Sequence, residues 1–89
     1  MFKNKSIIIT GGTGSFGKAF VKNLLKKRYP LRRIIIFSRD ELKQYEMKSS
    51  SQFSDQKHKN LRYFIGDVRD KNRLTHAFKE VDFVVHAAA

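Results

Sequence analysis

The stretch that decides the fold is residues 7–17, IIITGGTGSFG. Its three consecutive β-branched residues favour a strand, four glycines follow within eight residues, and a helical pattern begins near Ser15. A strand, a glycine-rich turn and a helix start in this order are typical of a dinucleotide-binding βαβ unit. The amides of the first helical turn would then face a diphosphate, with the positive end of the helix dipole behind them.

The glycines of this turn fit two spacings. Gly12, Gly14 and Gly17 match G-x-G-x-x-G, whereas Gly11, Gly14 and Gly17 match G-x-x-G-x-x-G. We expect Gly11 or Gly12 to allow a sharp turn off the strand. Gly14 would let a diphosphate approach the backbone, and Gly17 would let the helix pack closely. No Gly-Lys-Ser/Thr follows the glycines, which excludes a Walker A phosphate loop.

Composition limits the class of protein. The chain has 89 residues, 40% of them hydrophobic, which predicts one small globular domain. It has no cysteine, so disulfides, thiolate catalysis and zinc–sulfur sites are excluded. No apolar run approaches the ~20 residues of a membrane span, and the N-terminus leads into the first strand without room for a signal peptide. A cytoplasmic protein is therefore expected.

The chain is strongly basic, with 19 Lys and Arg residues against 8 Asp and Glu residues and a formal net charge of +11. Most cations fall in predicted loops and at helix ends, so we interpret them mainly as a solvated surface. The alternative is an acidic partner: nucleic acid, anionic lipid or a nucleotide ligand. Because no stacking platform or recognition-helix signal accompanies the charge, we expect no specific nucleic-acid partner.

Strands and helices alternate along the sequence. Strands are predicted at residues 6–10, 33–37, 61–65 and 81–86. Helices are predicted from near residue 15 to before Pro30, from residues 38–41 to about 49, and from Asp70 to about Lys79. The inward face of the first helix is predicted to contain Phe16, Ala19, Phe20, Val21 and Leu24. The expected fold is α/β: a partial Rossmann fold whose four-stranded parallel sheet has the order 3-2-1-4 and helices on both faces.

The fourth strand is apolar and would lie at an open edge of this sheet, where exposed apolar strands are unusual. We therefore expect residues 1–89 to be the N-terminal part of an NAD(P)-binding Rossmann domain, truncated and without a substrate domain.

In such folds ligands bind outside the carboxyl ends of the strands. After the second strand, Ser38 and Arg39 occupy the place where an acid would contact the ribose 2′-hydroxyl of NAD. A guanidinium can pair with a 2′-phosphate, so we expect NADP, with NAD less favoured. In the alternative, Arg39 is solvated and Asp40 or Glu41 reaches the ribose.

The ends of the last two strands suggest further contacts. Asp67 is expected to accept a hydrogen bond from the adenine amino group while Val68 packs on the ring; alternatively, Asp67 only caps its own turn. The small residue Ala87 would let the cofactor lie against the backbone. His86 is interpreted as a structural histidine, and the three histidines show no metal-ligand spacing.

Four segments together resemble the extended short-chain dehydrogenase/reductase superfamily. They are residues 10–17 (TGGTGSFG), 38–41 (SRDE), 66–70 (GDVRD) and 86–89 (HAAA). Within the superfamily the chain is most similar to the inverting UDP-N-acetylglucosamine 4,6-dehydratases of surface-glycan and flagellin sugar pathways. The resemblance covers the whole chain. The glycine turn is common to the superfamily, whereas Ser-Phe-Gly followed by Ser-Arg-Asp-Glu-Leu-Lys is narrower.

The resemblance implies a cofactor site made of residues from all four strand ends. The diphosphate would be held by Thr13, Gly14, Ser15, Phe16 and Gly17; the 2′-phosphate by Ser38, Arg39 and Lys43; the adenine by Asp67 and Val68; and the inner ribose by Ala87, Ala88 and Ala89. Gly11 and Asp40 are also expected to belong to the cofactor-binding site.

The resemblance also implies an NADP-dependent lyase that acts on a UDP-sugar and is a homo-oligomer when full length. In the family, hydride leaves sugar C4, water leaves across C5 and C6, and hydride returns at C6, with the help of a Tyr-x-x-x-Lys pair. None of the three tyrosines here has lysine four residues on, so these residues alone are expected to be inactive. The alternatives are another extended short-chain enzyme, such as an epimerase or reductase, or a non-catalytic NADP-binding module.

Overall fold

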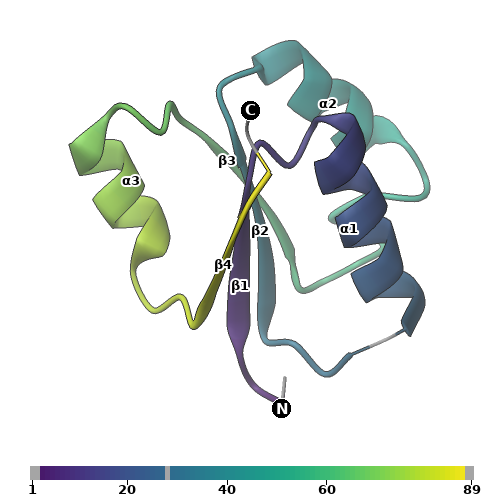
Figure 1. The fold of residues 1–89 in the computed structure, drawn as a ribbon. Coiled ribbons are helices and arrows are strands. Elements are labelled where there is room, and N and C mark those ends of the chain that lie inside the picture. Colours follow the sequence, from purple (N-terminus) through teal and green to yellow (C-terminus); the bar gives the residue numbers. More distant parts are fainter. Residues whose placement is uncertain (1–2, 28, 88–89) are drawn as a thin grey trace.

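Strands and helices alternate throughout the computed structural model, which describes residues 3–27 and 29–87. The elements are β1 (Ser6–Thr10), α1 (Ser15–Lys27), β2 (Arg33–Ser38), α2 (Glu41–Ser49), β3 (Leu61–Ile65), α3 (Lys71–Phe78) and β4 (Phe83–His86). Figure 1 shows the connections that follow β1, β2 and β3 at the same end of the sheet, at the top of the view. The predicted α/β alternation is confirmed.

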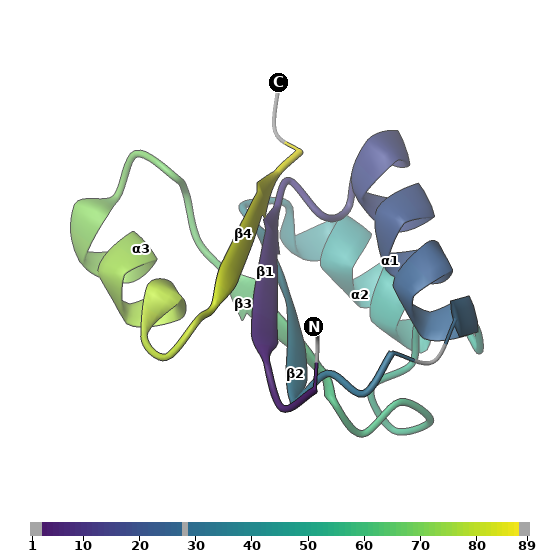
Figure 2. The same cartoon turned by 60° about the horizontal axis from the view of Figure 1, so that its bottom comes forward.

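The four strands are parallel and lie in the order β3-β2-β1-β4, as predicted. β1 lies between two partners, so that Ile8 is opposite Ile35 of β2 on one side and Val84 of β4 on the other. Figure 2 shows α1 and α2 together on one face of the sheet and α3 on the opposite face. The predicted cover of helices on both faces is therefore also confirmed.

Each face of the sheet has its own apolar core. Alternate strand residues point to opposite faces, so Ile7, Ile9, Ile34 and Ile36 pack with α1 and α2, whereas Ile8, Ile35 and Phe37 pack with Ala77 of α3. This arrangement explains the unbroken apolar run of β2, since a central strand covered on both faces has no solvent-facing side.

The rotation of α1 differs from the prediction. Phe16 is 62% exposed and Ala19 is also exposed, while the buried positions are Gly17, Val21 and Leu24. A side chain at Gly17 would place its Cβ 2.5 Å from the Cα of Gly12, so only glycine allows the helix to lie this close to the turn. This contact fixes the rotation of α1 and leaves Phe16 facing outward.

β4 begins at Phe83, two residues later than predicted. After α3 the chain makes a tight turn in which Glu80 has a φ of 61° and Val81 N–H donates to the carbonyl of Phe78 over 3.1 Å. Pairing with β1 then starts at Asp82, whose N–H donates to the Ser6 carbonyl and whose carboxylate accepts from Ser6 N–H, both over 2.8 Å. Val81, which was predicted to begin the strand, therefore belongs to the turn after α3.

The buried side chains of the inner strand β2 should contribute strongly to the stability of this fold. Ile36 is fully buried between β2 and the helix layer, so Ile36→Ala should lower the free energy of unfolding by about 2–5 kcal/mol through lost contacts and a cavity. Leu42→Ala is the control, because Leu42 is 66% exposed and its loss should change stability by less than about 0.5 kcal/mol. Urea denaturation of both variants measures the difference. Equal losses would contradict this assignment of the core.

Candidate functional site

The loops after β1, β2 and β3 enclose an open cleft of about 610 Å³ at the carboxyl ends of the strands. This volume lies in the range of small-molecule sites. The cleft also lies where the strand order reverses, because β1 has β2 on one side and β4 on the other. Its wall is formed by Gly11, Thr13, Gly14, Phe37, Ser38, Arg39, Asp40, Lys43, Gly66, Asp67, Val68, Arg69 and Ala87.

The turn after β1 distinguishes the two glycine spacings. Gly11 has a φ of 70°, a conformation that other residues rarely adopt, and its N–H donates to the Phe37 carbonyl over 2.8 Å. Gly12 is buried beneath the turn, where an added Cβ would lie 2.7 Å from Cγ2 of Ile36. Gly11 and Gly14 line the cleft and Gly12 does not. The geometry therefore favours the G-x-x-G-x-x-G spacing that begins at Gly11.

The last two glycines of the turn have different surroundings. A Cβ at Gly14 would make only an ordinary contact, 3.5 Å from the Gly11 carbonyl oxygen. A Cβ at Gly17 would meet the backbone of Gly11 and Gly12 at 2.5–2.8 Å. Gly14 thus leaves open space on the cleft side for a ligand, whereas Gly17 packs α1 on the turn. Ser15 and Phe16 are exposed at the start of α1, and the structure does not bring these two residues or Gly17 to the cleft wall.

The residues after β2 provide positive charge to the cleft. The side chain of Arg39 is 74% exposed and Lys43 is exposed, so both can reach a ligand. Asp40 is the N-cap of α2, and its carboxylate accepts from Lys43 N–H over 3.0 Å. Ser38 is nearly buried at the floor of the cleft. One carboxylate oxygen of Asp40 is therefore already used to begin the helix.

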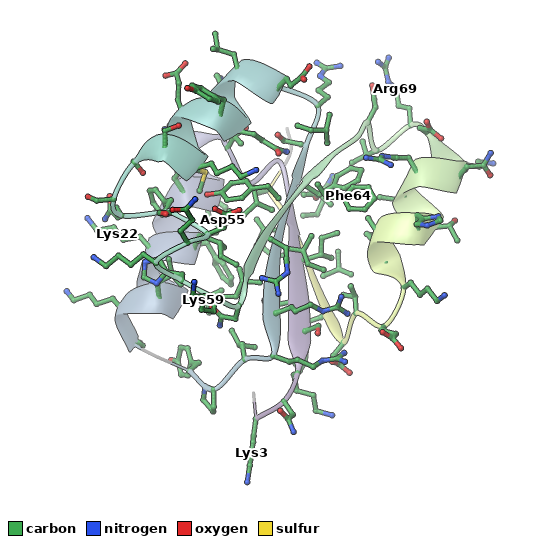
Figure 3. All side chains as sticks on the ribbon, turned by 180° about the vertical axis from the view of Figure 1, so that it is seen from behind. Lys3, Lys22, Asp55, Lys59, Phe64 and Arg69 are labelled. Atoms are coloured by element: carbon green, nitrogen blue, oxygen red, sulfur yellow. The ribbon has the colours of Figure 1, made fainter. Side chains whose placement is uncertain are left out.

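After β3, Asp67 and Arg69 form an ion pair, called here the Asp67–Arg69 fork, which was not predicted from the sequence. The carboxylate of Asp67 accepts from Arg69 N–H over 2.9 Å and from Arg69 Nη2 over 2.7 Å, and Arg39 Nη1 lies 3.8 Å away. Hydrogen bonds from the Arg69 side chain lower the pKa of Asp67 to about 2, so the carboxylate stays ionised. Figure 3 shows Arg69 on the loop between β3 and α3.

This geometry agrees with the alternative in which Asp67 caps its own turn, while the adenine contact stays a prediction. The Asp-x-Arg spacing at residues 67–69 was the available signal for the fork, because it places a guanidinium beside a turn carboxylate. Gly66 and Phe37 also line the cleft and were not predicted. A Cβ at Gly66 would lie 2.7 Å from Cζ of Phe37, so these two residues pack as one floor.

The end of β4 is held to β1. The Thr10 hydroxyl oxygen lies 2.6 Å from His86 Nδ1, and Ala87 N–H donates to the Thr10 carbonyl over 2.8 Å. This contact agrees with the interpretation of His86 as a structural histidine. Ala87 lines the cleft, whereas Ala88 and Ala89 lie outside the described residues.

Two further observations concern the described part of the chain only. Within residues 3–27 and 29–87, no group of three His, Asp or Glu side chains is placed to hold a metal ion. The same residues contain no helix with the length and apolar character needed to cross a membrane. In Figure 3, Lys3 and Lys22 point away from the body of the protein, as expected of a solvated basic surface.

Comparison with known proteins identifies the family. The polysaccharide biosynthesis protein family matches residues 7–89. The chain belongs to this family. Over its whole length it is 61% identical to a UDP-N-acetylglucosamine 4,6-dehydratase (inverting) from Campylobacter jejuni and, over a 91-residue alignment, 44% identical to a UDP-glucose 4-epimerase from Rickettsia bellii. It spans 25% of the length of each of these relatives.

A solved structure supports the same relationship. The dTDP-glucose 4,6-dehydratase of Bacillus anthracis, determined in complex with NAD, is 30% identical and superimposes with a TM-score of 0.75. The match covers 96% of this chain and 27% of that one. The Rossmann-type sheet of nucleotide-sugar dehydratases and the resemblance inferred from the sequence are both confirmed.

Gly14 and Gly17 should separate ligand binding from folding. Gly14→Val should fold with a change in stability of less than about 1 kcal/mol, because its Cβ would make only an ordinary contact, 3.5 Å from the Gly11 carbonyl oxygen. Its side chain should fill the cleft side of the turn and weaken dinucleotide binding by roughly tenfold or more. Gly17→Ala should instead destabilise the fold by about 2 kcal/mol or more, because the clash is with backbone atoms. Calorimetric titration and thermal melting of both variants test this distinction, which unimpaired binding by Gly14→Val would contradict.

The Asp67–Arg69 fork predicts a pH dependence. Because the folded-state pKa of Asp67 is about 2, below its ordinary value of 3.8, the fork stabilises the fold above about pH 4 and this contribution is lost as the pH falls toward 2. Arg69→Ala should raise the pKa of Asp67 toward 3.8, as measured by NMR titration of its carboxyl carbon. Arg62→Ala is the control, since Arg62 donates to Lys59 and Leu61 and does not contact Asp67. A pKa that stays near 2 in Arg69→Ala would disprove the assignment.

Proposed function

We propose that residues 1–89 form the NADP-binding portion of a UDP-N-acetylglucosamine 4,6-dehydratase. The observation that carries the cofactor assignment is the end of β2, where an exposed guanidinium from Arg39 lies at the cleft and the next acid along the chain, Asp40, caps α2. NAD enzymes commonly place an acid there to bind the ribose 2′-hydroxyl, whereas an arginine accommodates a 2′-phosphate.

The charge balance of the cleft supports a polyanionic ligand. Arg39, Lys43 and Arg69 line it together with two acids, Asp40 and Asp67. Both acids already accept hydrogen bonds from the protein, Asp40 from the backbone of α2 and Asp67 from Arg69. The exposed guanidinium and ammonium groups are thus the groups best placed to interact with phosphate oxygens.

The space beside Gly14 supports a diphosphate position next to the turn after β1. A ligand phosphate can approach the backbone there, next to the N-terminal end of α1. Bound NADP would supply hydride transfer, and the residues described here would bind and orient it. The chain contains no Tyr-x-x-x-Lys pair, so its own contribution is to hold the cofactor.

The identity of 61% to a UDP-N-acetylglucosamine 4,6-dehydratase supports this substrate for the whole protein, which would then be a lyase. A UDP-sugar epimerase is the second candidate, favoured by the 44% identity to UDP-glucose 4-epimerase. The cytoplasmic location and the homo-oligomeric state of the full-length enzyme stay predictions.

Arg39→Ala tests the cofactor assignment. The parent chain should bind NADP more tightly than NAD, and Arg39→Ala should weaken NADP binding by roughly tenfold while leaving NAD binding nearly unchanged. Arg62→Ala, which removes an exposed arginine outside the cleft, should leave both affinities unchanged. Isothermal titration of the parent chain and both variants with each cofactor measures the six dissociation constants. A parent chain that binds NAD as tightly as NADP would refute the assignment.

A further inference from the structure

A buried glutamine joins the ends of β2 and β3 beneath the cleft. Gln44 of α2 is 3% exposed, and its Nε2 lies 3.0 Å from Ser38 Oγ, 3.0 Å from the Phe64 carbonyl oxygen and 3.2 Å from the Ser38 carbonyl oxygen. The other buried residue of α2 is the apolar Met47. Packing alone would favour an apolar residue at position 44 as well, because a buried amide loses its contacts with water.

The contacts define which way the amide points. Two of the three neighbours are backbone carbonyl oxygens, which can only accept hydrogen bonds, so the amide nitrogen must face them. Its two protons are shared among three acceptors: the Phe64 carbonyl and the Ser38 hydroxyl, both at 3.0 Å, and the Ser38 carbonyl at 3.2 Å. The Ser38 carbonyl already accepts from Gly66 N–H over 2.9 Å. Gln44 therefore makes the Ser38 hydroxyl an acceptor.

This arrangement leaves one proton on the Ser38 hydroxyl for a ligand. A serine hydroxyl has one donor proton in addition to its acceptor sites. Among the described residues, Ser38 Oγ has no hydrogen-bond acceptor, and Ser38 is part of the cleft wall beside Arg39. A phosphate oxygen, which has no proton at neutral pH to compete, is a suitable acceptor.

We propose that Gln44 is a positioning residue for cofactor specificity: by donating to Ser38 Oγ, it directs the Ser38 proton toward the 2′-phosphate of NADP. This inference rests on the proposed function, since it requires NADP in the cleft. A purely structural Gln44 would tie α2 to β3 through the Phe64 carbonyl and would affect NADP and NAD equally. The ratio of the two affinities therefore distinguishes the roles.

The test measures Kd for NADP and NAD in the parent chain, Gln44→Met, Ser38→Ala and the double variant. Ser38→Ala should weaken NADP binding by roughly tenfold, because a hydrogen bond to a charged group is lost, and should leave NAD binding nearly unchanged. Gln44→Met preserves the volume of the side chain but cannot donate, so it should weaken NADP by roughly three- to tenfold. If Ser38 is already replaced by alanine, adding Gln44→Met should not reduce the preference for NADP any further. This preference is the ratio of the Kd for NAD to the Kd for NADP.

Tyr63→Phe is the matched control for lost stability. It removes another side-chain hydrogen bond, from Tyr63 to the Phe53 carbonyl over 2.7 Å, and should leave the NADP/NAD ratio unchanged. A parent chain without NADP preference would refute the proposed function itself. With that preference established, an unchanged ratio in Gln44→Met or Ser38→Ala, or an additive loss in the double variant, would overturn this inference alone. If Gln44→Met does not fold, an unchanged ratio in Ser38→Ala would still overturn the inference.

Discussion

The contact between Gly17 and the turn before α1 is the constraint on which the rest of the site depends. An added Cβ would lie 2.5 Å from Gly12 Cα, so the helix and the turn meet backbone to backbone. That contact fixes the rotation of α1, buries Val21 and Leu24 against the sheet and leaves the side of Gly14 open. The space for a ligand beside Gly14 therefore depends on the close packing of Gly17 against the backbone of the same turn.

Most of the architecture could be predicted from the sequence because local signals and burial agree. The alternation of apolar runs with helical patterns gave the four strands and their order, and Asp40 and Asp70 cap α2 and α3. The rotation of α1 could not be predicted from apolar spacing, because it depends on how closely two glycines approach each other. Gln44 was missed for a related reason: in a sequence, a polar residue on a helix indicates solvent, and only tertiary contacts show that it is buried.

The site also shows why net charge is a poor guide to binding. The chain has 19 cationic residues, and the structure places three of them, Arg39, Lys43 and Arg69, on the cleft wall. At the cleft, the carboxylates of Asp40 and Asp67 already accept hydrogen bonds from the protein, which leaves the cationic groups to interact with a ligand. Arg69 was not predicted because its partner, Asp67, was interpreted as a ligand contact. In a turn, a carboxylate finds a nearby backbone N–H and guanidinium before any ligand is present.

The position of β1 between β2 and β4 has a consequence for the order of folding. Ser6 N–H donates to the carboxylate of Asp82, 76 residues later in the chain. During synthesis β1 leaves the ribosome before β2 and can pair with it soon afterwards, but the other edge of β1 lacks its partner β4 until residues 82–86 have been made. Such long-range parallel pairing is slow, since a large loop must close before any contact forms. The pairing of β1 is therefore completed only by β4, which is made after both β2 and β3.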